Sequence, residues 1–487
     1  MRLKELLRVL SMESPVDMDI SSISCDSRLV QKGSLFVAID GLKDRGGNYI
    51  DEAIKRGAAC IIATDNKSTF DTKSIPLIKH SDTHSALAIL ADEFFGHPSG
   101  KIKVVGVTGT NGKTTITYLV ENIFKEAGLS SGIIGTICYS FKDKIIPACN
   151  TTPSALQLQP LLKQMLDAGC NYCIMEVSSH GLHQKRTLGI DFKAAIFTNL
   201  TQDHLDYHKN LEDYFLAKSR LFSGLSADAY SIVNADSPYA VRLKGLTPAR
   251  FITYGIDSQA DVSSCDLVLN GAGSEFLLKA EKFKFESKIK TSLIGKYNIS
   301  NILAGAAFAL TQGIPAGHIK KGIENFNGVK GRLEKVTQSS DTDIFIDYAH
   351  TPDALENVLD ILRQFSRGGL IVVFGCGGDR DRLKRPLMGS VADKYADFIV
   401  ITSDNPRSED PALIAVEISG GIRHKDYKII LDRREAIQFA VSRAKIGDTV
   451  LIAGKGHESY QIFQDKRIEF DDRKVVEECL AEKVTTS

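Results

Sequence analysis

The segment VVGVTGTNGKTT at residues 104–115 constrains the fold of this chain more than any other feature. Its apolar start predicts a buried strand, a turn rich in Gly and Thr follows, and apolar residues then recur at helical spacing from Ile116 to Phe124. A strand, a glycine-rich loop and a helix form a cradle for phosphate, in which backbone N–H groups and the helix N-terminus bind the phosphate oxygens. Lys113 would reach the outer phosphates and a threonine hydroxyl could hold Mg2+. The segment therefore predicts nucleotide binding.

This loop departs from the common phosphate-loop pattern GxxxxGK[ST], which requires Gly where the chain has Val107. The chain instead carries Gly109-x-x-Gly112-Lys113-Thr114, a narrower variant. We expect seven loop residues to contact the nucleotide: Gly109, Thr110, Asn111, Gly112, Lys113, Thr114 and Thr115. The alternative is a glycine-rich turn with a solvated lysine. Under that interpretation, the adjoining strand and helix would flank the turn by coincidence.

Length and charge restrict the class of protein. The 487 residues predict about three domains, at roughly 150 residues each. Sixty basic residues balance sixty acidic ones, which argues against a nucleic acid or a membrane bound through bulk charge. No apolar run approaches the roughly 18 residues of a membrane span, and the N-terminus has the leucine spacing of an amphipathic helix and lacks a secretory apolar region. We expect a soluble, cytoplasmic protein.

The nine cysteines are scattered along the chain. Cys170 and Cys173 form a lone CxxC within a strand-like run, and no second pair of ligands follows. This spacing favours a buried, reduced pair over a redox or zinc site.

The order of strand-like and helical segments indicates an α/β protein of three domains. Residues 1–98 form a small N-terminal α/β domain that ends in a linker at 96–100, and residues 99–330 form a central P-loop ATPase domain with a parallel sheet. A second break lies at 326–331, and residues 331–487 form a C-terminal Rossmann-like domain. Glycines at 375–378 follow a strand, where an open α/β sheet places its ligand loops, but they do not match the GxGxxG of a nicotinamide site.

Two polar clusters follow strands of the central domain. Glu176 ends a strand, where a carboxylate can hold Mg2+ directly or through water, although a surface acid is the alternative. A loop at 199–208 carries Asn199, Asp203, His204, Asp206 and His208. That density suggests metal or phosphate chemistry; the spacing fits no zinc pattern, and a polar turn is the alternative.

Two further clusters follow strands of the C-terminal domain. Asp347 and His350 end its first strand before Pro352 begins a helix, so they could equally be ordinary helix-start residues. Arg380 and Arg407 each follow a strand and are candidates for gripping carboxylates, because a guanidinium pairs with two oxygens at once. Ordinary exposed arginines are the alternative.

Taken with these residues, the chain resembles the Mur ligases, the ATP-dependent amino-acid-adding enzymes of bacterial peptidoglycan synthesis. The resemblance spans essentially the whole chain and rests on TGTNGKTT, EVSSHGL, TNLTQDHLDYH, GKYNISN, DYAHTPD, GCGGDRD and DNPR, in the family's order. DNPR at 404–407 is similar to the version in members that add meso-2,6-diaminopimelate to UDP-N-acetylmuramoyl-L-alanyl-D-glutamate. The resemblance implies an amide-bond-forming ligase of class EC 6.3.2 that uses ATP and Mg2+, serves cell-wall biogenesis, cell shape and division, and acts as a monomer.

The resemblance also implies roles for individual residues. The expected catalytic residues are Lys113, Lys218 and His204, with Lys218 carbamylated. The expected Mg2+ ligands are Thr114, Thr115, Glu176 and His204, and Asn298 and Arg332 join the loop at the nucleotide. The UDP-linked dipeptide is expected at Ser27, the turn at 42–44, Asn150, Thr151, Thr152, Ser178, Gln184 and Arg186. Diaminopimelate is expected at Arg380, Asp404, Asn405, Pro406, Arg407, Gly454 and Glu458. Without the resemblance, Lys218 reads as a solvated helix residue.

Three alternatives stay open at this point. A lysine-adding ligase or a folylpolyglutamate synthetase-like enzyme would share most of these motifs, but Arg407 and the full N-terminal domain argue against both. A nucleotide-dependent switch or motor would account for the phosphate loop and leave the C-terminal arginines without a role.

Overall fold

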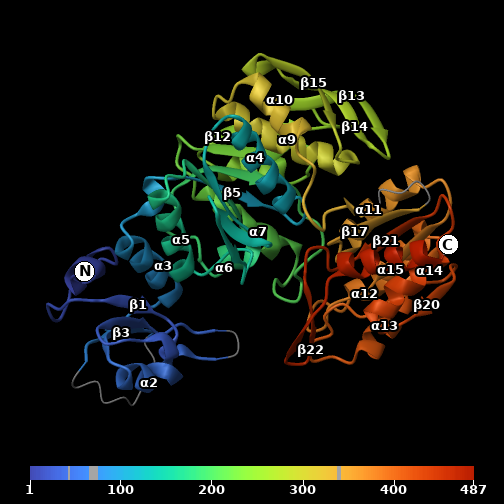
Figure 1. Ribbon diagram of the computed structural model, residues 1–487. Helices are drawn as coiled ribbons and strands as arrows, with labels where there is room; N and C mark the ends of the chain where they lie inside the picture. Colours follow the sequence, from blue (N-terminus) through green and yellow to red (C-terminus); the bar gives the residue numbers. More distant parts are fainter. Residues whose placement is uncertain (42–43, 65–74, 337–341, 487) are drawn as a thin grey trace.

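The computed structural model describes residues 1–41, 44–64, 75–336 and 342–486. In these residues the strands form sheets of four, eleven, six and two strands, and each sheet draws on one continuous part of the chain. Figure 1 shows the four-stranded sheet in blue, the eleven-stranded sheet in cyan to yellow, and the six-stranded sheet in orange to red. The α/β class with parallel sheets that the sequence predicts is confirmed.

The N-terminal sheet is parallel, with strands in sequence order. Its strands are β1 (Ser22–Ser24), β2 (Ser34–Val37), β3 (Ala58–Ala63) and β4 (Leu77–Lys79). Its helices are α1 (Leu3–Arg8), α2 (Ile50–Lys55) and α3 (Thr83–Phe94), with short 3-10 turns η1 (Ser27–Leu29), η2 (Gly46–Tyr49) and η3 (Pro98–Gly100). The expected amphipathic helix at the N-terminus is α1, which buries Leu3, Leu6 and Leu7.

The central sheet has the order β15-β14-β13-β12-β11-β10-β5-β9-β6-β7-β8. Its parallel strands are β5 (Lys103–Thr108), β6 (Ser131–Ile134), β9 (Tyr172–Glu176), β10 (Phe192–Phe197), β11 (Tyr230–Asn234), β12 (Arg250–Gly255) and β13 (Val262–Asn270). Antiparallel hairpins extend both edges through β7 (Cys138–Phe141), β8 (Lys144–Pro147), β14 (Gly273–Ala280) and β15 (Phe285–Thr291). The sequence prediction covered the parallel centre and not these hairpins, in which β7, β14 and β15 alternate between buried and more exposed residues and β8 has no buried residue.

Helices cover both faces of the central sheet. They are α4 (Lys113–Glu126), α5 (Ala155–Asp167), α6 (Ser179–His183), α7 (Leu211–Ser223), α8 (Ala240–Leu246), α9 (Lys296–Thr311) and α10 (Ala316–Glu324), with the turn η4 (Glu281–Phe283). Because side chains alternate along a strand, Val105 and Val107 of β5 pack in one core with α4 and α9, whereas Val104 packs in the opposite core with α5 and α7. This strand therefore carries the phosphate loop from the middle of a sheet buried on both faces.

The C-terminal sheet has the order β16-β17-β21-β18-β19-β20, in which only β16 is antiparallel to its neighbour. Its strands are β16 (Glu334–Lys335), β17 (Asp343–Asp347), β18 (Leu370–Phe374), β19 (Phe398–Ile401), β20 (Tyr427–Ile429) and β21 (Thr449–Ala453), followed by the hairpin of β22 (Tyr460–Phe463) and β23 (Lys466–Glu469). Its helices are α11 (Pro352–Phe365), α12 (Lys384–Tyr395), α13 (Pro411–Ser419), α14 (Arg433–Arg443) and α15 (Asp472–Thr486).

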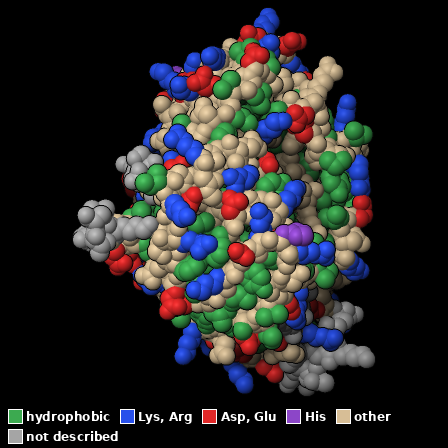
Figure 2. All heavy atoms as spheres, turned by 90° about the vertical axis from the view of Figure 1, so that its right-hand side faces the viewer, with side chains coloured by type: hydrophobic (Ala, Val, Ile, Leu, Met, Phe, Trp, Pro, Cys, Tyr) green, Lys and Arg blue, Asp and Glu red, His purple; other side chains and the backbone are tan. Residues whose placement is uncertain are grey.

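The distribution of surface charge and the state of the cysteines match what the sequence predicts. Figure 2 shows Lys and Arg side chains interspersed with Asp and Glu on the face where the C-terminal region lies. Within the described residues, no helix combines the length and the apolar composition that a membrane crossing requires. Cys170 and Cys173 are free thiols and both are buried, as predicted.

The packing of α10 against α4 generates a stability prediction. A Cβ atom on Gly322 would lie 2.5 Å from the Ile123 Cα, whereas a Cβ atom on Gly317 of the same helix would meet nothing within 4 Å. Gly322→Ala should destabilise the protein by about 1–3 kcal/mol through overpacking. Gly317→Ala should stabilise it by about 0.4–1 kcal/mol, because alanine restricts the unfolded chain. Urea unfolding midpoints that shift in the same direction for both variants would contradict this account of the helix contact.

Candidate active site

The phosphate loop lies between β5 and α4, where the sequence predicts it. Gly109 has a φ of 147°, and a Cβ atom there would lie 1.8 Å from the Thr198 Oγ1, so glycine is required at this position. The Asn111 N–H donates to the Asn199 Oδ1 (2.9 Å), and the Thr198 hydroxyl donates to the Asn111 carbonyl (2.6 Å). Residues after β10 therefore hold the loop in place.

Two lysine side chains converge on one carbonyl of this loop. The Lys113 Nζ donates to the Gly109 carbonyl at 2.9 Å and to the Thr110 carbonyl at 2.8 Å. The Lys218 Nζ, from α7, donates to the same Gly109 carbonyl at 2.9 Å and lies 4.5 Å from the centre of the Tyr214 ring. The interpretation of Lys218 as a solvated helix residue is wrong, because its side chain is only 1% exposed. Helix periodicity did not reveal which face of α7 the phosphate loop covers.

Burial and like charge change the protonation of both lysines. Burial lowers the pKa of Lys218 well below its ordinary value, and the neighbouring Lys113 cation lowers it further. Burial also lowers the pKa of Lys113, while Glu176 and Asp203 oppose that shift. Both amines donate only to carbonyl oxygens among the described residues, and Glu176 opposes the pKa shift of Lys113 but not that of Lys218.

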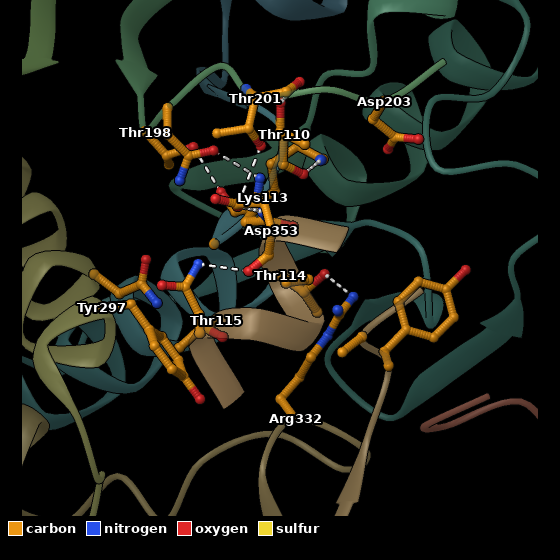
Figure 3. Close-up of a pocket in the computed structure, with 18 of the residues that line it drawn as sticks. Thr110, Lys113, Thr114, Thr115, Thr198, Thr201, Asp203, Tyr297, Arg332 and Asp353 are labelled. Atoms are coloured by element: carbon orange, nitrogen blue, oxygen red, sulfur yellow. Dashed lines mark hydrogen bonds between the residues drawn. The ribbon is translucent and has the colours of Figure 1, made fainter. Parts of the chain in front are cut away.

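A cavity of about 380 Å3 opens at the phosphate loop (Figure 3). Its walls include the loop residues from Thr110 to Thr115, as well as Asn298 and Arg332. The Arg332 Nη2 donates to the Thr114 hydroxyl at 3.1 Å, and its guanidinium lies 4.5 Å from the centre of the Tyr348 ring. The loop and the C-terminal part of the chain thus share one cavity.

Glu176 lies at the end of β9 and is fully buried, which excludes the surface-acid alternative. Its carboxylate accepts hydrogen bonds from the Thr114 hydroxyl (3.0 Å), the Thr136 hydroxyl (3.0 Å) and the Thr136 N–H (2.9 Å). Carboxylate and hydroxyl oxygens are the donors that Mg2+ prefers. Among the described residues no group of three or more His, Cys, Asp or Glu could hold a metal, so water and phosphate would have to complete the coordination of Mg2+.

His204 lies beside this cavity and has a left-handed backbone, with a φ of 55°. Its Nε2 lies 3.4 Å from the Asp203 Oδ2. Burial lowers the pKa of His204 to about 3, so the imidazole is neutral near pH 7. Thr115 lines the same cavity, and Thr114, Thr115, Glu176 and His204 are therefore all gathered there.

A second cavity, of about 340 Å3, adjoins the first, and both are lined by Thr151, Ser178, Asp203, His204, Tyr348 and His350. Its central-domain wall contains Asn150, Thr152 and Arg186. The Arg186 Nη1 donates to the Thr152 carbonyl (2.7 Å), and its Nε and Nη2 donate to the Gln184 Oε1 (3.0 and 2.6 Å). Gln184 therefore supports Arg186 and does not itself line either of the two cavities.

The C-terminal wall of the second cavity contains six of the seven residues expected at diaminopimelate: Arg380, Asp404, Asn405, Arg407, Gly454 and Glu458. Pro406 does not line it. The Asn405 Nδ2 donates to the Glu458 Oε2 at 2.9 Å, and the buried Lys455 Nζ donates to the Asn405 Oδ1 and the Glu458 Oε2 at 3.2 and 2.9 Å. Burial alone would raise the pKa of Asp404, but the Lys455 cation lowers it, so this carboxylate stays charged.

One further expected site residue, Ser27, is placed away from both cavities. Ser27 lies in η1 of the N-terminal part, where its hydroxyl donates to the Glu52 Oε2 at 2.6 Å, and it lines neither cavity. Of the expected turn at 42–44, residues 42 and 43 lie outside the described residues. Asn298 does line the first cavity, and its Nδ2 donates to the Ile294 carbonyl at 3.0 Å.

The sequence did not single out Asp353 or Lys384. The Asp353 Oδ2 accepts hydrogen bonds from the Asn111 Nδ2 (2.8 Å) and the Thr201 hydroxyl (3.2 Å), which joins α11 to the phosphate loop. Lys384 is the first residue of α12 and lines the second cavity. Asp353 follows β17 and Lys384 follows β18. Their positions after the carboxyl ends of parallel strands could have marked them as candidate site residues in the sequence.

The phosphate loop on the central parallel sheet thus faces a second α/β sheet across two joined cavities. The chain belongs to the Mur ligase family, as relatives at 42–45% identity over at least 95% of its length show. Three family models match it: "Mur ligase family, catalytic domain" at residues 19–95, "Mur ligase middle domain" at 107–309 and "Mur ligase, glutamate ligase domain" at 331–456.

Two of the most similar relatives share the name of one ligase. The UDP-N-acetylmuramoyl-L-alanyl-D-glutamate--2,6-diaminopimelate ligase of Syntrophomonas wolfei is 45% identical over 99% of this chain and 100% of its own length. The protein of that name from Clostridium botulinum is 44% identical over 95% of this chain and 96% of its own length. A solved structure titled as the same ligase superposes with a TM-score of 0.71 at 31% identity, covering 99% of this chain and 100% of the other. MurF from Thermotoga maritima, solved with ADP, shares the fold at a TM-score of 0.63 and 19% identity, over 96% of this chain and 98% of the other.

The hydrogen bonds of Asp353 generate a prediction about the contact between the two sheets. Asp353→Ala should weaken the contact between α11 and the phosphate loop by about 1.5–3 kcal/mol, as expected for hydrogen bonds to a charged group. Amide hydrogen exchange at residues 109–115 should then accelerate. Asn357→Ala is the comparison variant, because the Asn357 Nδ2 donates to the Asp353 carbonyl within the same helix (2.8 Å) and no hydrogen bond among the described residues links it to the phosphate loop. Equal exchange in both variants would show that Asp353 does not join the two parts.

Proposed function

We propose that the chain is an ATP-dependent ligase that adds meso-2,6-diaminopimelate to UDP-N-acetylmuramoyl-L-alanyl-D-glutamate in peptidoglycan synthesis, and so serves cell-wall biogenesis, cell shape and division. One observation carries the proposal: the phosphate-loop cavity adjoins a second cavity whose C-terminal wall presents Arg380 and Arg407. Relatives at 42–45% identity that bear this ligase's name support it. The proposed domains are 1–98 for the UDP end, 99–330 for ATP and 331–487 for the amino acid, and the enzyme acts as a cytoplasmic monomer.

The reaction needs activation because a carboxylate does not react with an amine directly. The γ-phosphoryl group of ATP is transferred to the side-chain carboxylate of the D-glutamate residue, which forms an acyl phosphate and ADP. The amine of diaminopimelate then attacks the acyl carbon, the C–N bond forms, the bond to phosphate oxygen breaks, and the amine loses a proton. Lys113 and the N-terminus of α4 offset the negative charge that builds up where two anions meet.

Thr114, Thr115, Glu176 and His204 would hold Mg2+, which supplies further positive charge at the ATP phosphates when bound. The hydrogen bond between Thr114 and Glu176 places two oxygen donors together. The low pKa of His204 leaves its imidazole unprotonated and able to act as a ligand. Asn298 and Arg332 would contact the nucleotide from the other side of the same cavity.

The acceptor and the amino acid would meet in the second cavity. Asn150, Thr151, Thr152, Ser178 and Arg186 would contact the muramoyl dipeptide, with Gln184 orienting Arg186 and Ser27 serving the UDP end. Arg380 and Arg407 would bind carboxylate, while Asp404, Asn405 and Glu458 would bind the distal ammonium, beside Pro406 and Gly454. Lysine lacks the distal carboxylate and would leave an arginine unpaired, a mismatch that can discriminate by up to roughly 10⁴-fold.

The surroundings of Lys218 support its carbamylation. Only an unprotonated amine adds to CO2, and burial lowers the pKa of Lys218 well below its ordinary value, which favours that form. The addition forms an N–C bond and releases one proton, which turns a potential cation into an anion. Such an anion would remove the repulsion between Lys218 and Lys113 across the Gly109 carbonyl and support the metal site.

Phosphate release with one substrate omitted at a time tests the proposed function. The complete mixture of ATP, Mg2+, the UDP-linked dipeptide and diaminopimelate should release phosphate, and omission of the dipeptide or of diaminopimelate should abolish release. Lysine in place of diaminopimelate should lower kcat/KM by roughly 10³–10⁴-fold. Hydrolysis of ATP without the amino acid would indicate a switch or motor, and equal use of lysine would overturn the role of Arg407.

Removal of the Lys218 amine tests the modification. Lys218→Ala should lose most turnover and recover part of it when short carboxylic acids are added, because they replace the carbamate anion. Wild-type protein in 13C-bicarbonate should show a carbamate carbon signal that the variant lacks. Lys163→Ala, on an exposed surface, is the control and should behave as wild type. Normal turnover of untreated Lys218→Ala would exclude a catalytic role.

A further inference from the structure

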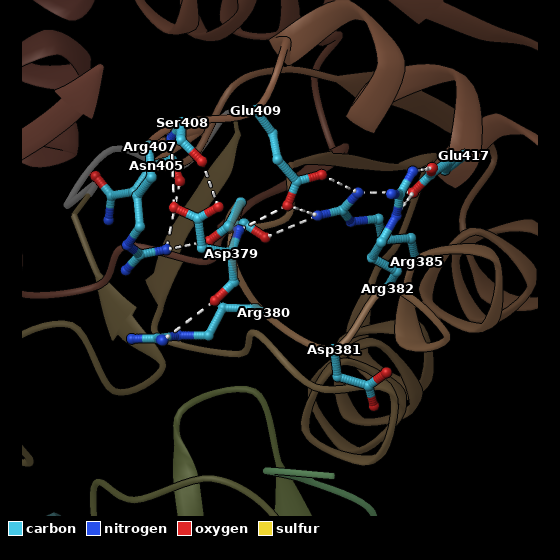
Figure 4. A network of polar contacts seen from close by, with 12 residues as sticks. Asp379, Arg380, Asp381, Arg382, Arg385, Asn405, Arg407, Ser408, Glu409 and Glu417 are labelled. Carbon is cyan, nitrogen blue, oxygen red and sulfur yellow. Dashed lines mark hydrogen bonds and ion pairs between the residues drawn. The ribbon is translucent and has the colours of Figure 1, made fainter. Parts of the chain in front are cut away.

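The two arginines of the C-terminal wall sit on loops that leave neighbouring strands, one after β18 and one after β19 (Figure 4). Each loop contains a non-glycine residue in the left-handed backbone region: Asp379 has a φ of 52° and Arg407 a φ of 51°. Such a conformation costs on the order of 1–3 kcal/mol and persists only where surrounding contacts impose it. Asp379 directly precedes Arg380, so the strained backbone sets the direction of both cavity arginines.

An ion pair between a buried arginine and a half-buried carboxylate joins these loops. Arg385, on the first turn of α12, is fully buried and donates from Nη1 and Nη2 to both carboxylate oxygens of Glu409, at 2.9 and 2.8 Å. The Glu409 Oε1 also accepts the Asp379 N–H at 2.6 Å. The Arg385 Nη2 further donates to the Gly377 carbonyl at 3.3 Å. One carboxylate from the second loop thus fixes the backbone of the first loop at its strained residue.

Further hydrogen bonds hold the two loops against each other. The Ser408 hydroxyl donates to the Asp379 Oδ1 at 2.6 Å, and the Arg407 Nη1 donates to the Gly378 carbonyl at 2.7 Å. A Cβ atom on Gly378 would lie 1.9 Å from the Pro406 carbonyl oxygen, so the loops are in direct contact. A shift of either loop would therefore move both arginine side chains.

Glu417 contacts the same arginine and has a different role. It lies on α13, accepts from the Arg385 Nη1 at 2.6 Å and pairs with Arg382. Among the described residues it makes no hydrogen bond to the backbone of either loop. Glu409 bridges the two loops, whereas Glu417 attaches Arg385 and Arg382 to the neighbouring helix α13.

We propose that the Arg385–Glu409 pair is a positioning device that sets the specificity of the amino-acid site without touching the substrate. Neither residue lines the two cavities, whereas Arg380 and Arg407 both line the second. The pair holds the two guanidiniums at the separation and direction that the carboxylates of diaminopimelate require. This inference rests on the proposed function and adds the residues that enforce its selectivity.

The substitution Glu409→Gln distinguishes a positioning role from a purely electrostatic one, because the two roles predict opposite changes in KM for diaminopimelate. Loss of a negative charge near Arg380 and Arg407 would by itself strengthen the attraction for a dicarboxylate and lower KM. Loss of the bridge would let the loops move and raise KM. Glu417→Gln removes one negative charge from Arg385, and with it the partner of Arg382, but leaves the bridge in place, which makes it the control.

We expect Glu409→Gln to raise KM for diaminopimelate about tenfold with kcat within about twofold of wild type, and to reduce the preference for diaminopimelate over lysine. Glu417→Gln should leave KM unchanged or lowered. Urea unfolding midpoints of the two variants check that they lose comparable stability. An equal rise of KM in both variants, or a fall in Glu409→Gln, would overturn the positioning role.

A second measurement needs no substrate. The Asp379 amide donates to Glu409, so its hydrogen exchange should accelerate in Glu409→Gln and stay near the wild-type rate in Glu417→Gln. If the wild-type enzyme does not use diaminopimelate, the proposed function fails, and the exchange rates still decide whether the bridge holds the loop. Equal exchange in all three proteins would refute the bridge whatever the substrate is.

Discussion

Two lysine ammonium groups share the Gly109 carbonyl, and the rest of the site depends on how that crowding of positive charge is resolved. Lys113 and Lys218 each donate to this oxygen at 2.9 Å. Burial lowers the pKa of Lys218 well below its ordinary value, and the neighbouring Lys113 cation lowers it further, because one carbonyl dipole cannot stabilise two buried cations. The pKa of Lys113 is lowered by burial as well, so both amines beside the loop are easier to deprotonate than an exposed lysine. We propose that carbamylation completes this arrangement by replacing a repulsive charge with an attractive one.

The carboxyl ends of two parallel sheets supply the remaining groups. The phosphate loop, Glu176 and His204 follow strands of the central sheet, while Asp353, Arg380 and Arg407 follow strands of the C-terminal sheet. Open α/β sheets bind ligands at such ends because helix N-termini and loops gather there. The hydrogen bonds of Asn111 with Asp353 and of Arg332 with Thr114 join the two sets, so a nucleotide and an amino-acid substrate would share one enclosed space.

Specificity in the C-terminal wall depends on residues that do not face the substrate. Arg385, Glu409 and Ser408 hold two strained loop residues, and Lys455 holds Asn405 beside Glu458. Ion pairs of this kind, with a buried cation and a half-buried carboxylate, contribute little net stability, because desolvation of the cation offsets the attraction between the charges. Their role here is to set geometry. The guanidiniums of Arg380 and Arg407 repel each other, and the hydrogen bonds and ion pairs of the two loops keep both directed at one cavity.

The sequence by itself determined the phosphate loop, the α/β class, the strand ends that carry Glu176, Arg380 and Arg407, and the family, because these depend on local periodicity and on short motifs. It could not determine the burial of Lys218, the role of Asp353 or the bridge through Glu409. Each of these requires contact between residues far apart in the chain, such as Lys218 with Gly109 or Asn111 with Asp353. The edge hairpins of the central sheet were also missed, since their strands are half-exposed. Local sequence patterns indicate which chemical groups the chain carries. Only the tertiary structure decides which of these groups are buried next to one another, and burial beside a like charge is what shifts their pKa values.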